Sequence, residues 1–199
     1  CVNLEQIDIP DAVNTIGDNA FRNCSALTSF EIPDGVTSIG YNASCNCIAL
    51  ASINISDGVV SIGNGAFDGC YSLKSDFDIP NSVSWIGNYA FRGCSSLTSI
   101  TIPAGVTSIG ELAFYKCENL KTVINLSVLD IVKGAETHGG VALYADKVLT
   151  PGVYLDHTEL TMQEDDKSVL EATVIPEGSV TWSSSAESVA TVDQAGHVT

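Results

Sequence analysis

The chain has 199 residues, of which 45% are hydrophobic, so it is long enough for one long domain or two short ones with a real core. Charged residues make up only 16%, and 24 acidic residues face 8 basic ones, for a net charge of −16. Such a surface repels phosphate groups, which argues against nucleic acid and anionic membranes as partners. No apolar run is long enough for a transmembrane segment. The chain starts with cysteine and has no signal peptide, so we expect a mature or excised fragment.

Residues 1–125 repeat one pattern in steps of 23 or 24 residues. Each step is marked by a cysteine: Cys1, Cys24, Cys47, Cys70, Cys94 and Cys117. In each unit a leucine, an apolar pair, usually a proline, a second apolar pair and a glycine follow at fixed offsets. A unit this short cannot bury its own apolar face, so the units are predicted to stack as a solenoid.

Each unit is expected to contain three local structures. The segment 97–103, "LTSITIP", alternates apolar and polar residues and predicts a strand that ends at its proline. The segment 106–110, "VTSIG", predicts a second short extended piece that ends at a glycine turn. The segment 88–94, "NYAFRGC", predicts at most one helical turn, with phenylalanine filling the core. Equivalent strands of successive coils should pair in parallel, about 4.8 Å apart.

Three positions depart from the pattern. The 24-residue unit carries its extra residue near Asp76, where we expect a bulge or a looser strand entry. Ser56 stands in place of proline, and Ser44 replaces the core phenylalanine of its unit. The missing ring should leave a void unless Tyr41 or a neighbouring side chain fills it.

The pattern L-x-x-I-x-I-P-x-x-V-x-x-I-G-x-x-A-F-x-x-C resembles the BspA-like class of leucine-rich repeats, found on bacterial surfaces and in some protozoa. The resemblance covers roughly residues 1–125. It implies a repeat solenoid of the α/β class, dominated by parallel strands with single-turn helices. The first domain would then be 1–125, with five coils and a partial sixth.

The repeat cysteines are expected to form an inward row, one in each coil. The spacing between coils would fit a disulfide by Cα distance, but side chains in register run parallel and keep the Cβ atoms too far apart. A straight row also does not converge on one zinc ion. Reduced, buried cysteines are therefore favoured over disulfides and metal. Cys45 occupies an outward position and is expected to be an exposed thiol.

The period is lost after Leu126. Residues 126–153 contain two apolar stretches around a turn at Gly139-Gly140, and we expect a hairpin or strand pair that caps the solenoid. This segment also resembles the cap that follows the last repeat in BspA-like proteins.

From Tyr154 onward the sequence changes to short alternating stretches that resemble the bacterial immunoglobulin-like domain of group 2. The matching residues are Leu170, Ala172, Val174 and Pro176, then Trp182 to Ser185, then Val189 to Asp193 with Gly196. Residues 154–199 are about half of such a sandwich, judged by the usual length of roughly 100 residues. The incomplete β-sandwich would expose sheet edges, so we expect disorder, strand exchange or a dimer contact there, or completion by further chain.

No motif in the chain points to catalysis. His138, His157 and His197 have no ligand or catalytic spacing, and no nucleotide-binding or nucleophile motif is present. We therefore expect no enzyme activity, no catalytic residue, no cofactor and no metal site.

Repeats place outward residues in columns, which form a binding surface rather than a pocket. One column between the core residues of the first strand is acidic to polar: Asp8, Glu31, Asn54, Asp78 and Thr101. Trp85 interrupts a column of small hydroxyl side chains, and the flanking turns carry Tyr41, Tyr71, Tyr89 and Tyr115, which could join Trp85 in binding. The five residues of the column, together with Trp85 and Tyr89, are the candidate ligand-binding surface. Solubility alone is the favoured explanation of the column's charge, and Trp85 could equally cover apolar surface between coils.

The resemblance to BspA-like repeats implies adhesion, meaning attachment to host matrix proteins, receptors, glycans or other cells, from the cell surface or the extracellular medium. The Ig-like part would be a stalk or spacer. Two other functions stay open: a structural spacer for a domain outside these residues, and a polysaccharide-binding accessory module, which would need aromatic side chains aligned on one face.

Overall fold

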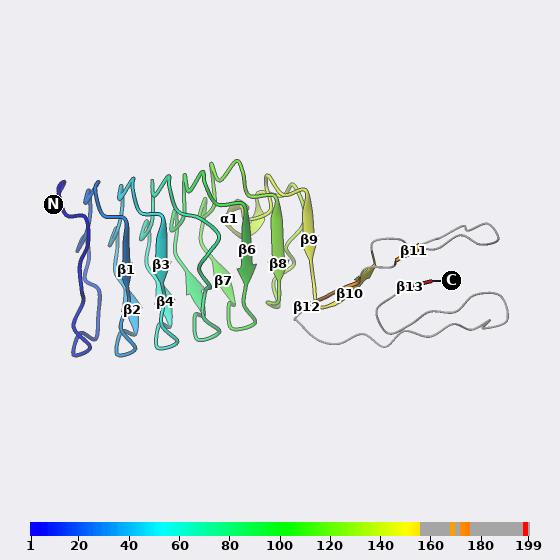
Figure 1. Cartoon of the computed structure of the whole chain (residues 1–199), viewed down its shortest axis with the longest axis horizontal. Coiled ribbons are helices and arrows are strands. Elements are labelled where there is room, and N and C mark those ends of the chain that lie inside the picture. The colour runs from blue at the N-terminus through cyan, green and yellow to red at the C-terminus, as the bar shows by residue number, and fades with distance from the viewer. Residues whose placement is uncertain (156–167, 170–171, 176–196, 199) are drawn as a thin grey trace. The chain divides into compact units, whose positions relative to one another are not determined.

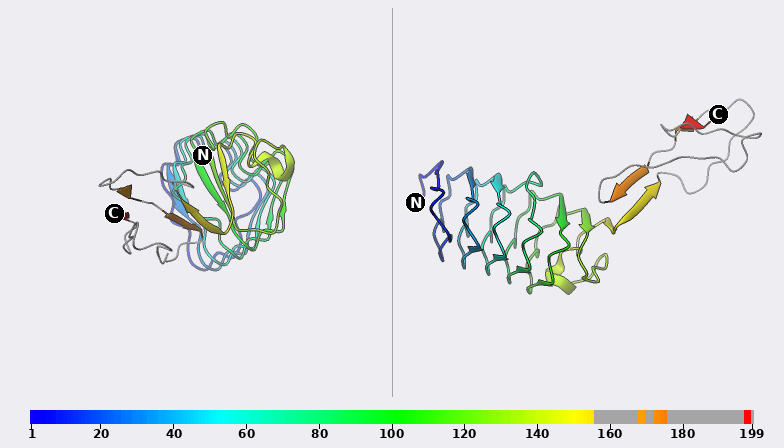
Figure 2. Two further views of the ribbon diagram at one scale, coloured as in Figure 1. Left: turned by 90° about the vertical axis from the view of Figure 1, so that its right-hand side faces the viewer. Right: turned by 90° about the horizontal axis from the view of Figure 1, so that it is seen from below.

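The computed structural model describes residues 1–155, 168–169, 172–175 and 197–198, which belong to two units. Unit 1 is Cys1–Leu149 and unit 2 is Thr150–Thr199. In unit 1 the coils stack one after another from the N-terminus (Figure 1), and they superimpose when seen along the stack (Figure 2, left). The predicted solenoid of parallel strands is confirmed.

The first strands of the coils pair in parallel. β1 (Ser29–Glu31) pairs with β3 (Ser52–Asn54), and β6 (Ser99–Ile102) pairs with β8 (Thr122–Asn125). Residues 74–79 of the coil between β3 and β6 form no strand, so this layer is interrupted at the extra residue near Asp76. The looser strand entry that we predicted there is confirmed.

The second strands form one parallel sheet that is not interrupted. It contains β2 (Ser38–Ile39), β4 (Ser61–Ile62), β5 (Trp85–Ile86) and β7 (Ser108–Ile109), in that order. In every strand the isoleucine is buried in the core. The stack therefore stays in register across the 24-residue unit, because the pairing of the second strands continues without a break there.

The segment between the second strand and the cysteine forms consecutive turns rather than a helical turn. In the third coil, for example, the Phe67 N–H bonds to the Ala90 carbonyl of the next coil at 2.7 Å, whereas the Cys70 N–H bonds back to the Phe67 carbonyl at 3.2 Å. Each coil has two residues with positive φ in this segment, among them Gly65 and Gly69. A left-handed residue at every fourth position is incompatible with a right-handed helix. These turns add a third ladder of hydrogen bonds between coils.

Aromatic rings fill the core along the turn segments. Phe67, Phe91 and Phe114 stack with ring centroids 5.3 and 5.2 Å apart. Ser44 interrupts this row: it is fully buried, and its hydroxyl has no hydrogen-bond partner within the described residues. Tyr41 is 51% exposed and does not take the place of the missing ring.

The segment after the last repeat adds another coil rather than the hairpin or strand pair that we expected between its two apolar stretches. β9 (Lys147–Leu149) pairs parallel, not antiparallel, with β8, and the stretch that contains Ile131 packs against the core without forming a strand. The expected turn at Gly139-Gly140 is present within α1 (Thr137–Gly140), where both glycines have positive φ. The Gly139 carbonyl accepts the Phe114 N–H at 2.9 Å, so the turn ladder continues into this coil.

Unit 2 contains two described antiparallel strand pairs. β10 (Gly152–Leu155) pairs with β12 (Ala172–Ile175), and β11 (Ser168–Val169) pairs with β13 (His197–Val198). The predicted segments at Trp182 and at 189–193, and His157, lie outside the described residues. The incomplete sandwich and its dimer contact therefore stay predictions.

Gly139 should be intolerant of a side chain. Its φ of +68° is left-handed, and a Cβ there would lie 2.7 Å from the Ala113 Cβ and close to the Gly110 carbonyl. Gly139→Ala should lower the free energy of unfolding by about 2–4 kcal/mol, from backbone strain plus overpacking. The matched control is Gly134→Ala, because φ is also positive there but a Cβ would meet nothing within 4 Å. This control substitution should lower the free energy of unfolding by about 1–2 kcal/mol. Equal losses in chemical denaturation would contradict the close packing of Gly139 against the last repeat.

Ser44→Ala should stabilise the protein. The substitution removes a buried hydroxyl that makes no hydrogen bond, and we expect a gain of about 1 kcal/mol in the free energy of unfolding. Ser61→Ala, on the surface of β4, should change stability by less than about 0.5 kcal/mol. A loss of stability in Ser44→Ala would show that its hydroxyl is satisfied in solution.

Candidate functional site

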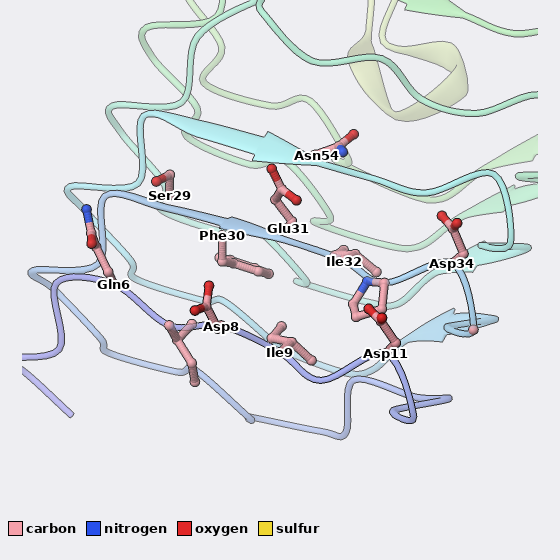
Figure 3. A pocket seen from close by; sticks show the side chains of 13 residues that line it. Gln6, Asp8, Ile9, Asp11, Ser29, Phe30, Glu31, Ile32, Asp34 and Asn54 are labelled. Atoms are coloured by element: carbon pink, nitrogen blue, oxygen red, sulfur yellow. The ribbon is translucent and has the colours of Figure 1, made fainter.

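The first strands carry an acidic surface, which we call the first-strand face. Asp8, Glu31 and Asn54 stand at equivalent positions of three successive coils, since Glu31 pairs with Asn54 in the sheet and Gln6 bridges to Ser29. Figure 3 shows these side chains on the same side of neighbouring chain segments. They line a hollow of about 760 Å³ together with Asp11 and Asp34.

A second hollow of about 450 Å³ continues the first-strand face toward the interrupted coil. Glu31 and Asn54 line both hollows, and Asp76 and Asp78 are added in the second. None of the lining residues, all within the described part of the chain, is lysine or arginine. The result is a run of carboxylates without local neutralisation, which creates a negative potential over the face.

The structure therefore brings together four of the seven candidate residues: Asp8, Glu31, Asn54 and Asp78. Thr101, in β6, is half-buried and lines neither acidic hollow. The prediction missed Asp11 and Asp34, which follow the prolines that end the first strands of two coils. Asp11 and Asp34 occupy equivalent positions of two successive repeats, so the alignment of repeats that identified Glu31 would have identified them as well.

Trp85 faces outward from the second-strand sheet, as predicted. It is 38% exposed and pairs in register with Ser61 on one side and Ser108 on the other. It lines neither acidic hollow, so the structure does not join it to the first-strand face.

Tyr89 lies on the turn segments, apart from both sheets, in a cluster with Arg92 and Asp68. The Arg92 guanidinium is 4.8 Å from the centre of the Tyr89 ring. Its Nε donates to Asp68 Oδ1 at 2.8 Å, and its Nη2 donates to the other carboxylate oxygen. Hydrogen bonding to Asp68 raises the pKa of Arg92, so this guanidinium stays charged.

The predicted row of buried repeat cysteines is confirmed from Cys24 to Cys117, and Cys1 is exposed. The thiols of the inner coils point to backbone carbonyls of the preceding coil, for example Cys70 Sγ to Ser44 O at 3.2 Å and Cys117 Sγ to Phe91 O at 3.1 Å. Burial raises the pKa of Cys47 to about 11 and that of Cys117 to about 12. Such thiols are protonated and unreactive at neutral pH.

The prediction that Cys45 is an exposed thiol is wrong. Cys45 is only 5% exposed, although it lines a surface hollow that Arg22 and Arg92 also line. Its column holds Arg22 in the preceding coil and Asp68 in the next, so a short side chain there is covered by longer ones. Burial and then Asp68 raise the pKa of its thiol.

Within the described residues, no group of three or more His, Cys, Asp or Glu side chains is placed to hold a metal ion. None of the described helices is both long and apolar enough to cross a lipid bilayer.

Comparison with known proteins finds similarity in two regions. The model of the BspA type leucine rich repeat region matches residues 1–121 and 75–134, and that of the bacterial Ig-like domain (group 2) matches residues 150–199. Leucine-rich-repeat families are typically non-enzymatic binding or structural proteins, and no catalytic family is indicated. No curated protein sequence matches the chain.

Several solved structures are similar to most of the chain. A leucine-rich repeat protein from Bacteroides ovatus is 37% identical with a TM-score of 0.62, and the match covers 74% of this chain but 40% of that one. The leucine rich repeat protein of T. pallidum is 28% identical with a TM-score of 0.59 and 72% coverage of each chain. The pneumococcal vaccine antigen PcpA shares the fold at 21% identity, with a TM-score of 0.57 and coverage of 74% of this chain and 42% of its own.

The buried cysteines should make stability fall above pH 9. The pKa of Cys117 rises from 9.0 in the unfolded chain to about 12 in the folded one, so its contribution is complete below pH 9 and is lost as the pH approaches 12. At pH 10 the raised pKa of this cysteine alone should lower the free energy of unfolding by about 1.4 kcal/mol relative to its value well below pH 9. In urea unfolding, Cys117→Ala should be less stable than the wild-type protein at pH 8. Its free energy of unfolding should, however, fall less than that of the wild-type protein between pH 8 and pH 10. An equal loss in both proteins would contradict a protonated, buried thiol.

Proposed function

Because this chain belongs to the BspA-type leucine-rich-repeat family, we propose that it is a bacterial cell-surface or secreted adhesion protein whose solenoid binds an extracellular protein. Proteins built from leucine-rich repeats generally bind other proteins, and the in-register columns of unit 1 provide an extended surface for that purpose. The matched Ig-like region would serve as a stalk or spacer. Host matrix proteins, receptors and the surfaces of other cells are the partners we propose.

The acidic first-strand face is the observation that carries this proposal. Its two adjoining hollows are lined by Asp8, Glu31 and Asp78 together with other acids, and by no base. Charge complementarity then favours a partner segment rich in lysine and arginine. Carboxylates on successive coils would attract such a segment to the first-strand face and fix its position along the coils. The affinity should fall as the salt concentration rises.

Trp85 offers a second candidate contact for the same function. An exposed tryptophan between two serines gives a large apolar surface on an otherwise small-residue sheet, and tryptophan is enriched among the residues that dominate binding energy. The clustering of the acidic residues favours the first-strand face over Trp85 as the main site.

The test is binding to immobilised extracellular matrix proteins and to a lysine-rich decapeptide. The triple variant Asp8→Asn, Glu31→Gln, Asp78→Asn should weaken binding at least tenfold, about 1.4 kcal/mol, and reduce its salt dependence. The matched control removes three exposed acids elsewhere in unit 1: Glu118→Gln, Asp130→Asn and Glu136→Gln. It should leave affinity nearly unchanged.

Three results would speak against the first-strand face. Equal losses in the triple variant and its control would mean that only net charge matters. A loss confined to Trp85→Ala would keep adhesion but move the site to the second-strand sheet. Absence of binding to every matrix protein and to the peptide would leave the structural spacer as the function.

A further inference from the structure

The turn segments carry a second surface that differs from the first-strand face. Two adjoining hollows, of about 380 and 480 Å³, share Asn46, Asp68, Tyr89 and Arg92 in their lining. We call them together the turn-face groove. Both volumes lie within the range of small-molecule pockets.

Tyrosines gather in the turn-face groove. Four of the six tyrosines of the chain line it, and three of them are strongly exposed: Tyr41 at 51%, Tyr71 at 52% and Tyr115 at 37%. Tyr89 lies between them and is half-buried. These four residues stand at different offsets of the repeat, so no column of the sequence displays them together. They gather at one groove the kind of aromatic side chain that binding to a polysaccharide needs, with flat apolar faces and polar hydroxyl ends.

Backbone strain is concentrated at the same groove. The left-handed positions of the turn segments hold asparagine or glycine in the first three coils, which adopt positive φ readily. Tyr89, Leu112 and Lys116 instead have φ of +60°, +53° and +62°, and all three line the groove. Bulky residues in this conformation are costly and tend to mark functional positions. Their side chains are thus held at the groove at an energetic cost to the fold.

The groove is also positively charged on a chain with a net charge of −16. Arg22, Arg92 and Lys116 line it against a single acid, Asp68. Asp68 pairs with Arg92, whose guanidinium also lies over the Tyr89 ring, so this arginine is fixed in place. Arg22 and Lys116 form no ion pair within the described residues, so both charges are available to a ligand; the Lys116 ammonium lies over one side of the Tyr115 ring, 5.8 Å from its centre.

From these observations we propose that the turn-face groove binds an acidic oligosaccharide. The sugar rings would lie on the exposed faces of Tyr71 and Tyr115, with a carboxylate or sulfate near Lys116 or Arg22. Aromatic faces alone would accept a neutral sugar, and the positive charges alone would accept any small anion. The combination selects a ring-bearing anion. This site is independent of the first-strand face and of the protein partner proposed for it.

The experiment measures binding of defined probes to the full chain by calorimetry and saturation-transfer NMR. The probes are 3′-sialyllactose, sulfated lactose, a trigalacturonic acid, neutral lactose and an acidic peptide of alternating glutamate and glycine. At least one acidic sugar should bind at least tenfold more tightly than lactose and the peptide. Equal binding of lactose, tight binding of the peptide, or no binding of any acidic sugar would overturn the proposal.

Two variants locate the site without endangering the fold. Tyr89→Asn and Lys116→Asn place at these positions the residue that the first two coils already carry there, so neither should lower the melting temperature. Each should nevertheless weaken binding of the acidic sugar at least tenfold. Glu31→Gln, on the first-strand face, is the control and should leave sugar binding unchanged. Full binding in both asparagine variants would overturn the assignment to this groove.

Discussion

The backbone hydrogen bonds between coils are the constraint on which the rest of unit 1 depends. They form only when equivalent residues of successive coils lie side by side, as in the pairing of Phe30 with Ile53 or of Ile62 with Ile86. On the turn segments the same rule joins every second N–H to the next coil. The repeat of 23 residues is the sequence form of this rule, because a constant unit length returns equivalent residues to the same place in each coil. The one 24-residue unit keeps the later coils in register but forms no first strand where its extra residue lies. Buried columns must then hold residues of similar size, whereas outward columns are free to vary.

Departures from the repeat pattern disturb the structure only locally. The extra residue near Asp76 interrupts the first-strand layer, but the second-strand sheet and the turn ladder continue past it. Ser44 breaks the row of phenylalanine rings, yet its backbone N–H still bonds to the Ala66 carbonyl at 2.7 Å. Three ladders hold each coil, so a fault in one of them leaves two intact. This redundancy lets the outward residues, including the strained Tyr89, vary without loss of the solenoid.

Much of this fold could be predicted from the sequence because period, alternation and core residue type all follow from the stacking rule. The parallel strands, the buried cysteines and the outward position of Trp85 were accessible in this way. The left-handed turns were not, since Tyr89 and Leu112 occupy positions where their residue types are unfavourable.

The other failures have the same local character. The burial of Cys45 depends on the length of neighbouring side chains, not on its own position in the repeat. The parallel pairing of β9 lies beyond the end of the sequence period, where register no longer guides a prediction. The acidic column was readable from the register, and the four tyrosines could be placed on the flanking turns. Their gathering in one groove with Arg22, Arg92 and Lys116 was not readable, because these residues come together only across different offsets of the repeat.

The fold thus separates charge onto two surfaces: carboxylates on the first-strand face and most of the basic side chains of the five repeats on the turn segments. A protein partner bound at the first-strand face would cover its carboxylates. Carbodiimide labelling of carboxyl groups, read by mass spectrometry with and without a bound matrix protein, would detect this cover. We expect Asp8, Glu31 and Asp78 to be protected in the complex while Glu118 and Asp130 are labelled as in the free chain. Unchanged labelling of the first three in a complex that still forms would contradict binding at the first-strand face.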